Sequence, residues 1–161
     1  MDITLRPIES ADLDAFFVHQ QHKPAQHMAA FIHEEPSNRA HFDAHWAKLM
    51  SRDSILKRSI EHEGTLVGHI MSFDMLDEQD QPVREITYWI DHRCWGKGIA
   101  SEGLRRFLDV ESARPLYGRA AKDNIASIRS MEKCGFMLEA EERGFAHARG
   151  EEIAEVVMVL A

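Results

Sequence analysis

The sequence predicts an α/β fold in which a central β-sheet is flanked by helices, within one domain spanning residues 1–161. Runs of strand-like composition alternate with runs of helical periodicity along the chain. The length suits one hydrophobic core, and no internal repeat, low-complexity tract or long linker divides it. A glycine-bearing turn near residue 96 also joins a strand-like run to a helix-like run, which is typical of α/β proteins that bind phosphate.

The elements of the N-terminal half follow from capping and turn signals. Residues 3–6 are predicted to form a strand, and Ser10 is expected to cap a helix that continues to about residue 20. Residues 21–36 are polar and rich in histidine and proline, so a loop is expected there. A second helix is predicted over residues 37–50. The apolar residues expected to be buried on these helices are Leu13, Phe16, Phe17, Phe42, Trp46 and Leu49 or Met50.

The C-terminal part reads as strands, interrupted by two helices. Glu63 and Gly64 form a turn signal between two strand-like runs, and a polar loop at residues 77–82 precedes a third run. The predicted strands are residues 55–62, 65–73, 83–90, 116–121, 136–142 and 151–160, and the predicted helices are residues 98–110 and 125–134.

Composition restricts the class of protein. Hydrophobic residues make up 44% and charged residues 29% of the chain, which is ordinary for a globular protein. The net charge of −8 argues against non-specific binding of nucleic acid, which needs a basic surface. No apolar run reaches membrane-spanning length, and residues 1–7 lack a signal-peptide core, so no membrane association and a cytoplasmic location are expected. Cys94 and Cys134 do not suggest a disulfide framework.

The turn between the predicted strand at 85–90 and the helix after it has the composition of a phosphate-binding loop. The first turn of a helix carries unpaired N–H donors, and the helix dipole favours negative charge there. Gly96 and Gly98 let the backbone come close to a ligand. Position 101 is Ser, so the G-x-G-x-x-G dinucleotide fingerprint is incomplete, and G-x-x-x-x-G-K-[ST] is also absent. The loop therefore predicts a phosphorylated ligand of another kind.

Two motifs in the same order carry a family resemblance. Arg93, Gly96 and Gly98 form R-x-x-G-x-G, and residues 124–136 read N-x-x-S-x-x-x-x-E-K-x-G-F. Together these segments resemble the GNAT N-acetyltransferases, in particular the branch containing the ribosomal-protein N-terminal acetyltransferases RimJ and RimL. The resemblance implies the GNAT fold, with a mixed, mainly antiparallel sheet, and acetyl-CoA as co-substrate.

The resemblance also implies which residues hold acetyl-CoA. Backbone N–H groups between Arg93 and Ser101 would bind the pyrophosphate, and the pantetheine arm would lie beside the strand ending at Trp89 and Ile90. Asn124 would bind the pantetheine arm, although a helix N-cap is an equally ordinary role for it. The implied cofactor-binding residues are Trp89, Ile90, Arg93, Cys94, Trp95, Gly96, Lys97, Gly98, Ile99, Ala100, Ser101 and Asn124.

Two residues are candidates for proton chemistry. Glu85 aligns with an acidic residue common in the family and can act as general base, or it can be a strand carboxylate in a salt bridge. Many GNAT enzymes place a proton-donating Tyr where this chain has Met131. In the RimJ/RimL-like branch Ser127 would take that role, and the alternative for Ser127 is a first-turn serine that bonds to nearby backbone.

The implied function is acetyl transfer from acetyl-CoA directly to a primary amine, either a protein or peptide N-terminus or a small-molecule amine. Because the Tyr is missing, a non-catalytic acyl-CoA-binding or sensing domain is the alternative. A homodimer is left open.

No metal site is expected, since His41 and His45 stand alone on a predicted helix. The segment that would roof the acceptor cleft contains histidines that either contact the substrate or are exposed loop residues, the second being favoured. The last hairpin loop would border that cleft or a dimer contact. These residues are His19, His22, His27 and His33, and Phe145, His147 and Arg149.

Overall fold

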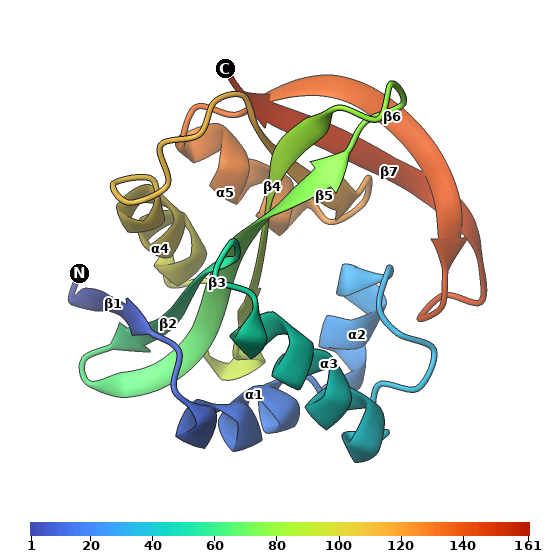
Figure 1. The fold of residues 1–161 in the computed structure, drawn as a ribbon. Coiled ribbons are helices and arrows are strands. Elements are labelled where there is room, and N and C mark those ends of the chain that lie inside the picture. The colour runs from blue at the N-terminus through green and yellow to red at the C-terminus, as the bar shows by residue number, and fades with distance from the viewer.

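The computed structural model describes residues Met1–Ala161 and contains one seven-stranded mixed sheet (Figure 1). The strand order is β1-β2-β3-β4-β5-β7-β6, and every neighbouring pair is antiparallel except β4 and β5. The predicted α/β class and the mainly antiparallel sheet are therefore confirmed. The strands are β1 (Ile3–Pro7), β2 (Leu56–His62), β3 (Thr65–Leu76), β4 (Pro82–Ile90), β5 (Leu116–Ala121), β6 (Met137–Ala146) and β7 (Glu151–Leu160).

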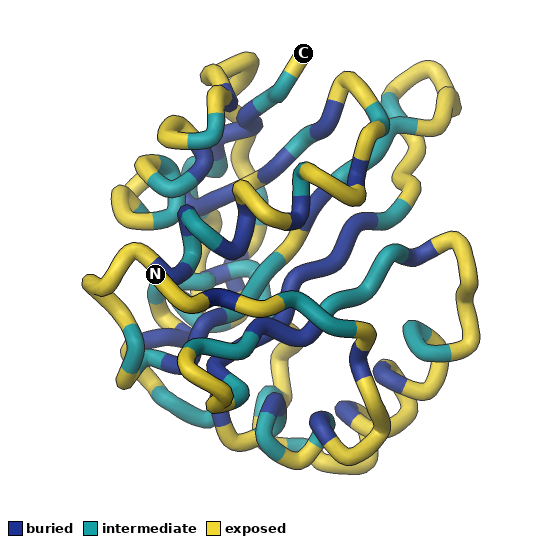
Figure 2. The backbone as a smooth tube through the Cα atoms, turned by 90° about the vertical axis from the view of Figure 1, so that its left-hand side faces the viewer, coloured by how far each residue is buried: buried dark blue, intermediate teal, exposed yellow.

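Helices cover both faces of the sheet (Figure 1). On one face, α4 and α5 pack over the main core, in which Ile99, Leu104 and Met131 are almost fully buried. On the other face, α1 and α3 enclose a second core around Phe16 and Trp46. Figure 2 shows that the buried residues gather in the central strands and on the inward sides of the helices. The helices are α1 (Leu13–His19), α2 (Lys23–Ala29), α3 (Arg39–Ser51), α4 (Ile99–Phe107) and α5 (Ile125–Lys133), with 3-10 turns at Ser10–Asp12 and His92–Cys94.

Two expectations for the N-terminal half are wrong. Ser10 does not cap the first helix, because Glu9 and Asp12 form a reciprocal capping box around the 3-10 turn instead. The segment expected to be a loop contains α2, with Pro24 in its first turn, where proline costs no hydrogen bond. The His22 ring caps this helix by accepting from the Ala25 N–H at 3.3 Å, a role that single-sequence capping rules do not assign to histidine.

The parallel strands β4 and β5 pair only at their beginnings. Their register runs from Arg84 opposite Leu116 to Ile86 opposite Gly118 and then stops. Beyond that point the edge of β4 that faces β5 has no strand partner, so the sheet is split between the last residues of β4 and those of β5. No helix of the chain is long and apolar enough to span a membrane.

Candidate active site

The loop after β4 places a row of unpaired backbone donors at the start of α4. The N–H groups of residues 96–101 have no acceptor in the protein. At α3 and α5 an asparagine side chain, Asn38 or Asn124, accepts a first-turn N–H, whereas the N-cap of α4 is Gly98, which has no side chain. Unpaired N–H groups together with the helix dipole form an anion site, so this part of the chain fits the pyrophosphate of a CoA-type ligand.

Two glycines shape this loop. Gly96 has φ 77° and Gly98 has φ 79°, both in the left-handed region that glycine adopts without strain. A Cβ at Gly96 would meet nothing within 4 Å, so the surface above the donors is open. The loop thus exposes backbone rather than side chains to a ligand.

Most side chains of the loop make contacts within the protein. The Arg93 guanidinium donates hydrogen bonds to the carboxylate of Asp91, with an Nη2 to Oδ2 distance of 2.7 Å. The Trp95 indole donates to the carbonyl of Ile90 at 3.1 Å. Ile99 and Ser101 are buried, Cys94 packs partly against the main core, and Lys97 is exposed. Arg93 and Trp95 therefore fix the loop to the end of β4, and the unpaired N–H groups remain its main ligand-binding feature.

Asp91 is a residue that the sequence argument missed. It is only 4% exposed, and burial alone would raise its pKa, but hydrogen bonds from Arg93 hold that pKa below its ordinary value. The His19 ring lies 3.7 Å from the same carboxylate, and the His92 ring lies 3.6 Å from it. His19 is thus buried, which corrects the expectation that it is an exposed loop residue. The available sequence signal was an acidic residue placed directly after a buried strand and two residues before Arg93.

Asn124 caps α5, as one of its two expected roles required. Its Oδ1 accepts from the Ser127 N–H at 3.3 Å, and its Nδ2 donates to the Met28 carbonyl at the end of α2 at 3.4 Å. The residue therefore connects the helix after β5 to the helix over the opposite face. A role in binding pantetheine stays a prediction.

Glu85 lies on the face of the sheet that carries α1 and α3, within an ion cluster. Arg119 on β5 donates to Glu85 Oε1 at 2.9 Å, to Glu142 at 2.6 Å and to Glu155 at 3.1 Å. The salt bridge expected as one alternative for Glu85 is therefore present. Burial raises the pKa of Glu155, Arg119 opposes this rise, and the carboxylates of Glu142 and Glu85 add to it. Three carboxylates share one cation, so this part of the face is negatively charged.

Ser127 makes a contact that its sequence motif does not predict. Its Oγ lies 2.9 Å from the hydroxyl of Tyr88, which reaches from β4 to the first turn of α5. Met131, which stands in the position of the usual family Tyr, is fully buried, and a Cβ at Gly118 would lie 2.5 Å from its sulfur. Met131 is therefore a core residue beneath β5, and the side-chain hydroxyls on this side of the gap are those of Tyr88 and Ser127.

The hairpin between β6 and β7 contacts α2 on the face of the sheet that carries Glu85. Arg149 donates to both carboxylate oxygens of Asp123, at 2.8 and 2.9 Å, and to the His27 carbonyl at 2.7 Å. We call these contacts of Arg149 with Asp123 and His27 the clamp. A cavity of about 520 Å³ lies beside the clamp and is lined by α2, residues 32–36 and His147. The hairpin loop expected to border the acceptor cleft thus contacts the histidine-rich segment expected to roof it.

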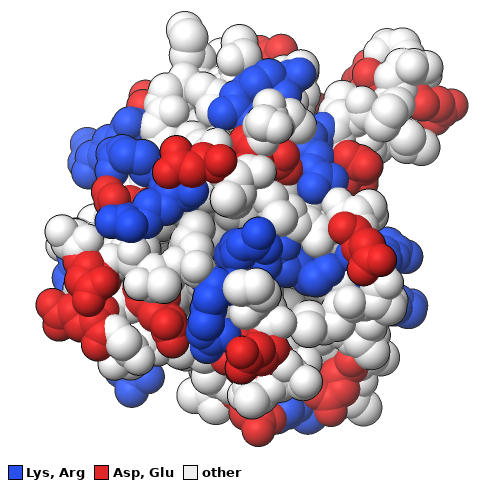
Figure 3. Space-filling model, turned by 60° about the vertical axis from the view of Figure 1, so that its left-hand side comes forward, with Lys and Arg blue, Asp and Glu red and all other residues white.

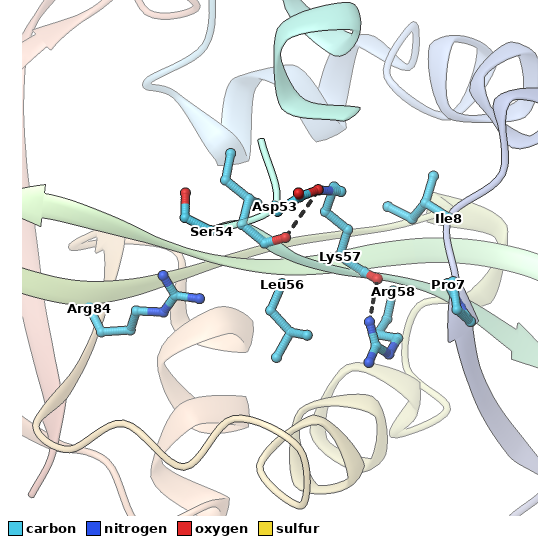
Figure 4. Close-up of a pocket in the computed structure, with 9 residues that line it drawn as sticks. Pro7, Ile8, Asp53, Ser54, Leu56, Lys57, Arg58 and Arg84 are labelled. Carbon is cyan, nitrogen blue, oxygen red and sulfur yellow. Dashed lines mark hydrogen bonds between the residues drawn. The ribbon is translucent and has the colours of Figure 1, made fainter. Parts of the chain in front are cut away.

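A second cavity, of about 430 Å³, lies at the other end of the sheet (Figure 4). Its cationic side chains are already engaged: Lys57 Nζ donates to the Ile55 carbonyl at 3.0 Å, Arg58 donates to the Lys57 carbonyl at 2.8 Å, and Arg84 pairs with Glu111 at 2.7 Å. This cavity contains none of the predicted site residues. On the face seen in Figure 3, lysine and arginine side chains form separate groups bordered by acidic ones. On α4, Glu102 pairs with both Arg105 and Arg106.

Comparison with known proteins identifies the family. The family model described as an acetyltransferase (GNAT) domain matches residues 2–137. The chain therefore belongs to the GNAT acetyltransferase family, in agreement with its mixed sheet and its glycine-containing loop before α4. No curated protein sequence matches the chain.

Solved structures share the fold over nearly the whole chain. The ribosomal-protein-alanine N-acetyltransferase from Brucella melitensis is 19% identical, with a TM-score of 0.80 over 98% of each chain. The spermidine N-acetyltransferase from Vibrio cholerae, in complex with CoA and spermine, is 18% identical, with a TM-score of 0.76 over 98% of this chain and 95% of that one. AAC(6')-Ib, in complex with ribostamycin and coenzyme A, is 17% identical, with a TM-score of 0.79 over 100% and 94%. At these identities the likeness concerns the fold.

Proposed function

We propose that this protein is an acetyl-CoA-dependent N-acetyltransferase of the RimJ/RimL-like branch that acetylates a primary amine by direct transfer. The observation that carries the proposal is the run of unpaired N–H groups at residues 96–101, next to the unpaired edge of β4. Similar structures were determined with CoA bound, which supports CoA as the ligand class. When bound, acetyl-CoA supplies the thioester whose acyl carbon the amine attacks.

The predicted site residues divide by role. The backbone of residues 93–101 binds the pyrophosphate, and Trp89, Ile90 and Asn124 hold the pantetheine arm beside the free edge of β4. Glu85 accepts the proton of the amine, directly or through water, on Oε2, because Arg119 donates only to Oε1. Ser127 donates to the departing sulfur. An α-amine, with a pKa of about 8, loses its proton more readily than a lysine amine, with a pKa of about 10.4.

For the acceptor we infer a cationic primary amine, either a protein or peptide N-terminus or a small-molecule amine. The three carboxylates around Arg119 give this face a net negative charge that attracts an ammonium group. Structural neighbours carry names that refer to ribosomal-protein alanine and spermidine, and one was determined with ribostamycin. A cytoplasmic location, the absence of nucleic-acid and membrane partners, and a homodimer stay predictions.

The test is release of free CoA thiol from acetyl-CoA in the presence of a panel of amines. The panel contains peptides with free N-termini, the same peptides with blocked N-termini, a polyamine and an aminoglycoside. We expect turnover with at least one free amine and none with the blocked peptides. Binding of acetyl-CoA without turnover of any amine would contradict catalysis and favour the alternative, a non-catalytic acyl-CoA-binding or sensing domain.

Glu85→Gln tests the base within the same assay, because the amide keeps the shape of the side chain but cannot take a proton. We expect a lower kcat at neutral pH that recovers in part as the pH rises and the free amine forms without help. An unchanged kcat and pH profile would show that Glu85 serves only the ion cluster with Arg119.

A further inference from the structure

The contact between Tyr88 and Ser127 is the one hydrogen bond between side chains of β4 and α5, and it lies beside the split in the sheet. We propose that Tyr88 is a positioning residue, which holds the Ser127 hydroxyl so that Ser127 can donate a hydrogen bond to the sulfur leaving acetyl-CoA. This inference rests on the proposed function. It gives a role to Tyr88, which lies outside the two motifs at residues 93–98 and 124–136.

The location of the pair follows from the strand register. Pairing of β4 with β5 ends at Ile86, two residues before Tyr88, so Tyr88 belongs to the part of β4 that has no partner on that side. Tyr88 packs against the main core on the face covered by α4 and α5. Ser127 lies in the first turn of α5, which follows directly after β5. The hydrogen bond therefore spans the split from one side to the other.

The hydroxyl proton of Ser127 is available to a ligand if Tyr88 is the donor in the pair. A serine hydroxyl has one proton and two acceptor positions. The only protein partner of Ser127 Oγ is the Tyr88 hydroxyl at 2.9 Å, and the Ser127 carbonyl lies 3.4 Å from the same hydroxyl. If Tyr88 donates, the Ser127 proton has no acceptor in the protein and is free for a ligand.

A second serine in the same helix shows the usual alternative. Ser130 Oγ donates to the carbonyl of Ala126, four residues earlier, at 3.0 Å. A serine bonded back in this way has used its only proton and can donate to nothing else. Ser127 makes no such bond, and its Oγ contacts the Tyr88 hydroxyl instead. Ser130 is therefore a matched control for Ser127.

Tyr88 is suited to be the donor in this pair. Burial raises the pKa of its phenol, so the phenol stays protonated at neutral pH and has a proton to donate. A phenol is a stronger hydrogen-bond donor than an aliphatic alcohol. Donation from Tyr88 to Ser127 also polarises the Ser127 O–H bond, which strengthens its donation onward.

The chemical step balances without an ionised tyrosine. The amine nitrogen forms a bond to the acyl carbon, the carbon–sulfur bond breaks, and the electron pair goes to sulfur. The proton of the amine goes to Glu85 or to water. Ser127 stabilises the negative sulfur through a hydrogen bond, and Tyr88 keeps its proton throughout. A thiolate is a fairly good leaving group, so no stronger acid is required.

The direct test measures the thiol pKa of CoA bound to the protein, by ultraviolet absorbance of the thiolate across a pH series. We expect a lower thiol pKa on the wild-type protein than on Tyr88→Phe or Ser127→Ala, by about one unit, the scale of one hydrogen bond to a charged group. The double variant should be no worse than either single one, because the two hydroxyls act as one unit. Ser130→Ala should match the wild type. An unchanged thiol pKa in Tyr88→Phe would overturn the proposal.

Kinetics and the ligand-free protein give two further readouts. With a good acceptor, Tyr88→Phe should lower kcat about tenfold, with little change in the KM for acetyl-CoA. Because Tyr88 and Tyr117 are the only tyrosines, a Tyr117→Phe background lets the Tyr88 phenol be titrated alone, and Ser127→Ala should shift that titration even if Tyr88→Phe fails to fold. An unshifted titration would overturn the pairing. If the wild type binds no CoA, the proposed function fails; if it binds and turns over but Tyr88→Phe behaves as wild type, only this inference fails.

Discussion

At the scale of single residues, buried histidines beneath the end of β4 are the most unusual feature. His69 on β3 is 5% exposed, and neither of its ring nitrogens has a partner in the protein. Phe16 and Trp46 pack against its ring at centroid distances of 4.7 and 5.1 Å. Burial lowers the pKa of His69 to about 3. The ring is therefore neutral in the folded protein at pH values above about 3.

This histidine should make the protein sensitive to acid. An unfolded histidine has a pKa of about 6.5, so between that pH and about 3 the unfolded state binds a proton that the folded state does not. Stability should thus fall as the pH drops below about 6.5, by up to about 1.4 kcal/mol per pH unit from this group. Urea unfolding across pH should show that His69→Leu loses much of this slope. The exposed His147, changed to Gln, should keep it, and equal slopes in all three proteins would contradict the assignment.

The residues that the sequence predicted best are those whose role is local. The glycines of the loop and the cap of α5 by Asn124 depend on neighbours in the chain, and the structure bears out both. Arg119 and Tyr88 were missed because their partners are distant in sequence: Arg119 meets Glu85 across the sheet, and Tyr88 meets Ser127 across the split. The contact of Asp91 with His19 is also distant in sequence, although Arg93, its main partner, is only two residues away. Periodicity and spacing carry no information on such contacts.

At the scale of elements, the start of α4 and the turn between β2 and β3 offer a matched comparison. Gly96 has φ 77° and Gly64 has φ 80°, and a Cβ at either would meet nothing within 4 Å. Alanine at each position should cost about the same stability, roughly 1 kcal/mol, because the strain comes from the backbone angle alone. Thermal unfolding can check this equality.

Their effects on ligand binding should differ. Gly96→Ala distorts the row of unpaired N–H groups, so we expect acetyl-CoA affinity to fall about tenfold, or about 1.4 kcal/mol. Gly64→Ala should bind as the wild type does. Equal loss of affinity in both variants would show that the effect is general destabilisation and not a property of the loop.

A second feature at this scale is the clamp by which Arg149 connects the last hairpin to α2. Arg149 is 8% exposed and binds both Asp123 and the His27 carbonyl, and beside it the Ala148 N–H donates to the Ala30 carbonyl. Arg149→Lys keeps the charge but loses the planar fork, so we expect a loss of about 1 kcal/mol, limited by the exposure of Asp123. Hydrogen exchange at Ala148 should quicken. Arg143→Lys, on the exposed side of the same hairpin, should leave the exchange rate at Ala148 unchanged. An unchanged rate in Arg149→Lys would show that Arg149 does not hold the hairpin against α2.

At the scale of the whole molecule, one sheet supports two cores and opens between β4 and β5. The order of the strands and of four helices could be predicted, since each has its own periodicity or turn signal. Helix α2 could not, because Pro24 and His27 lie within its seven residues and its position depends on contacts with β5 and the last hairpin. The position of the split could not be predicted from the sequence of either strand, because it depends on the residue at which β4 and β5 stop pairing.

The central claim is that the loop before α4 holds acetyl-CoA, and calorimetric titration of the purified protein with acetyl-CoA, CoA and ATP tests it most directly. We expect saturable binding of acetyl-CoA and CoA at one site per chain without comparable binding of ATP, because ATP lacks the pantetheine arm that we propose lies in the split beside β4. Absence of binding by both CoA species, or equal binding of ATP, would contradict it.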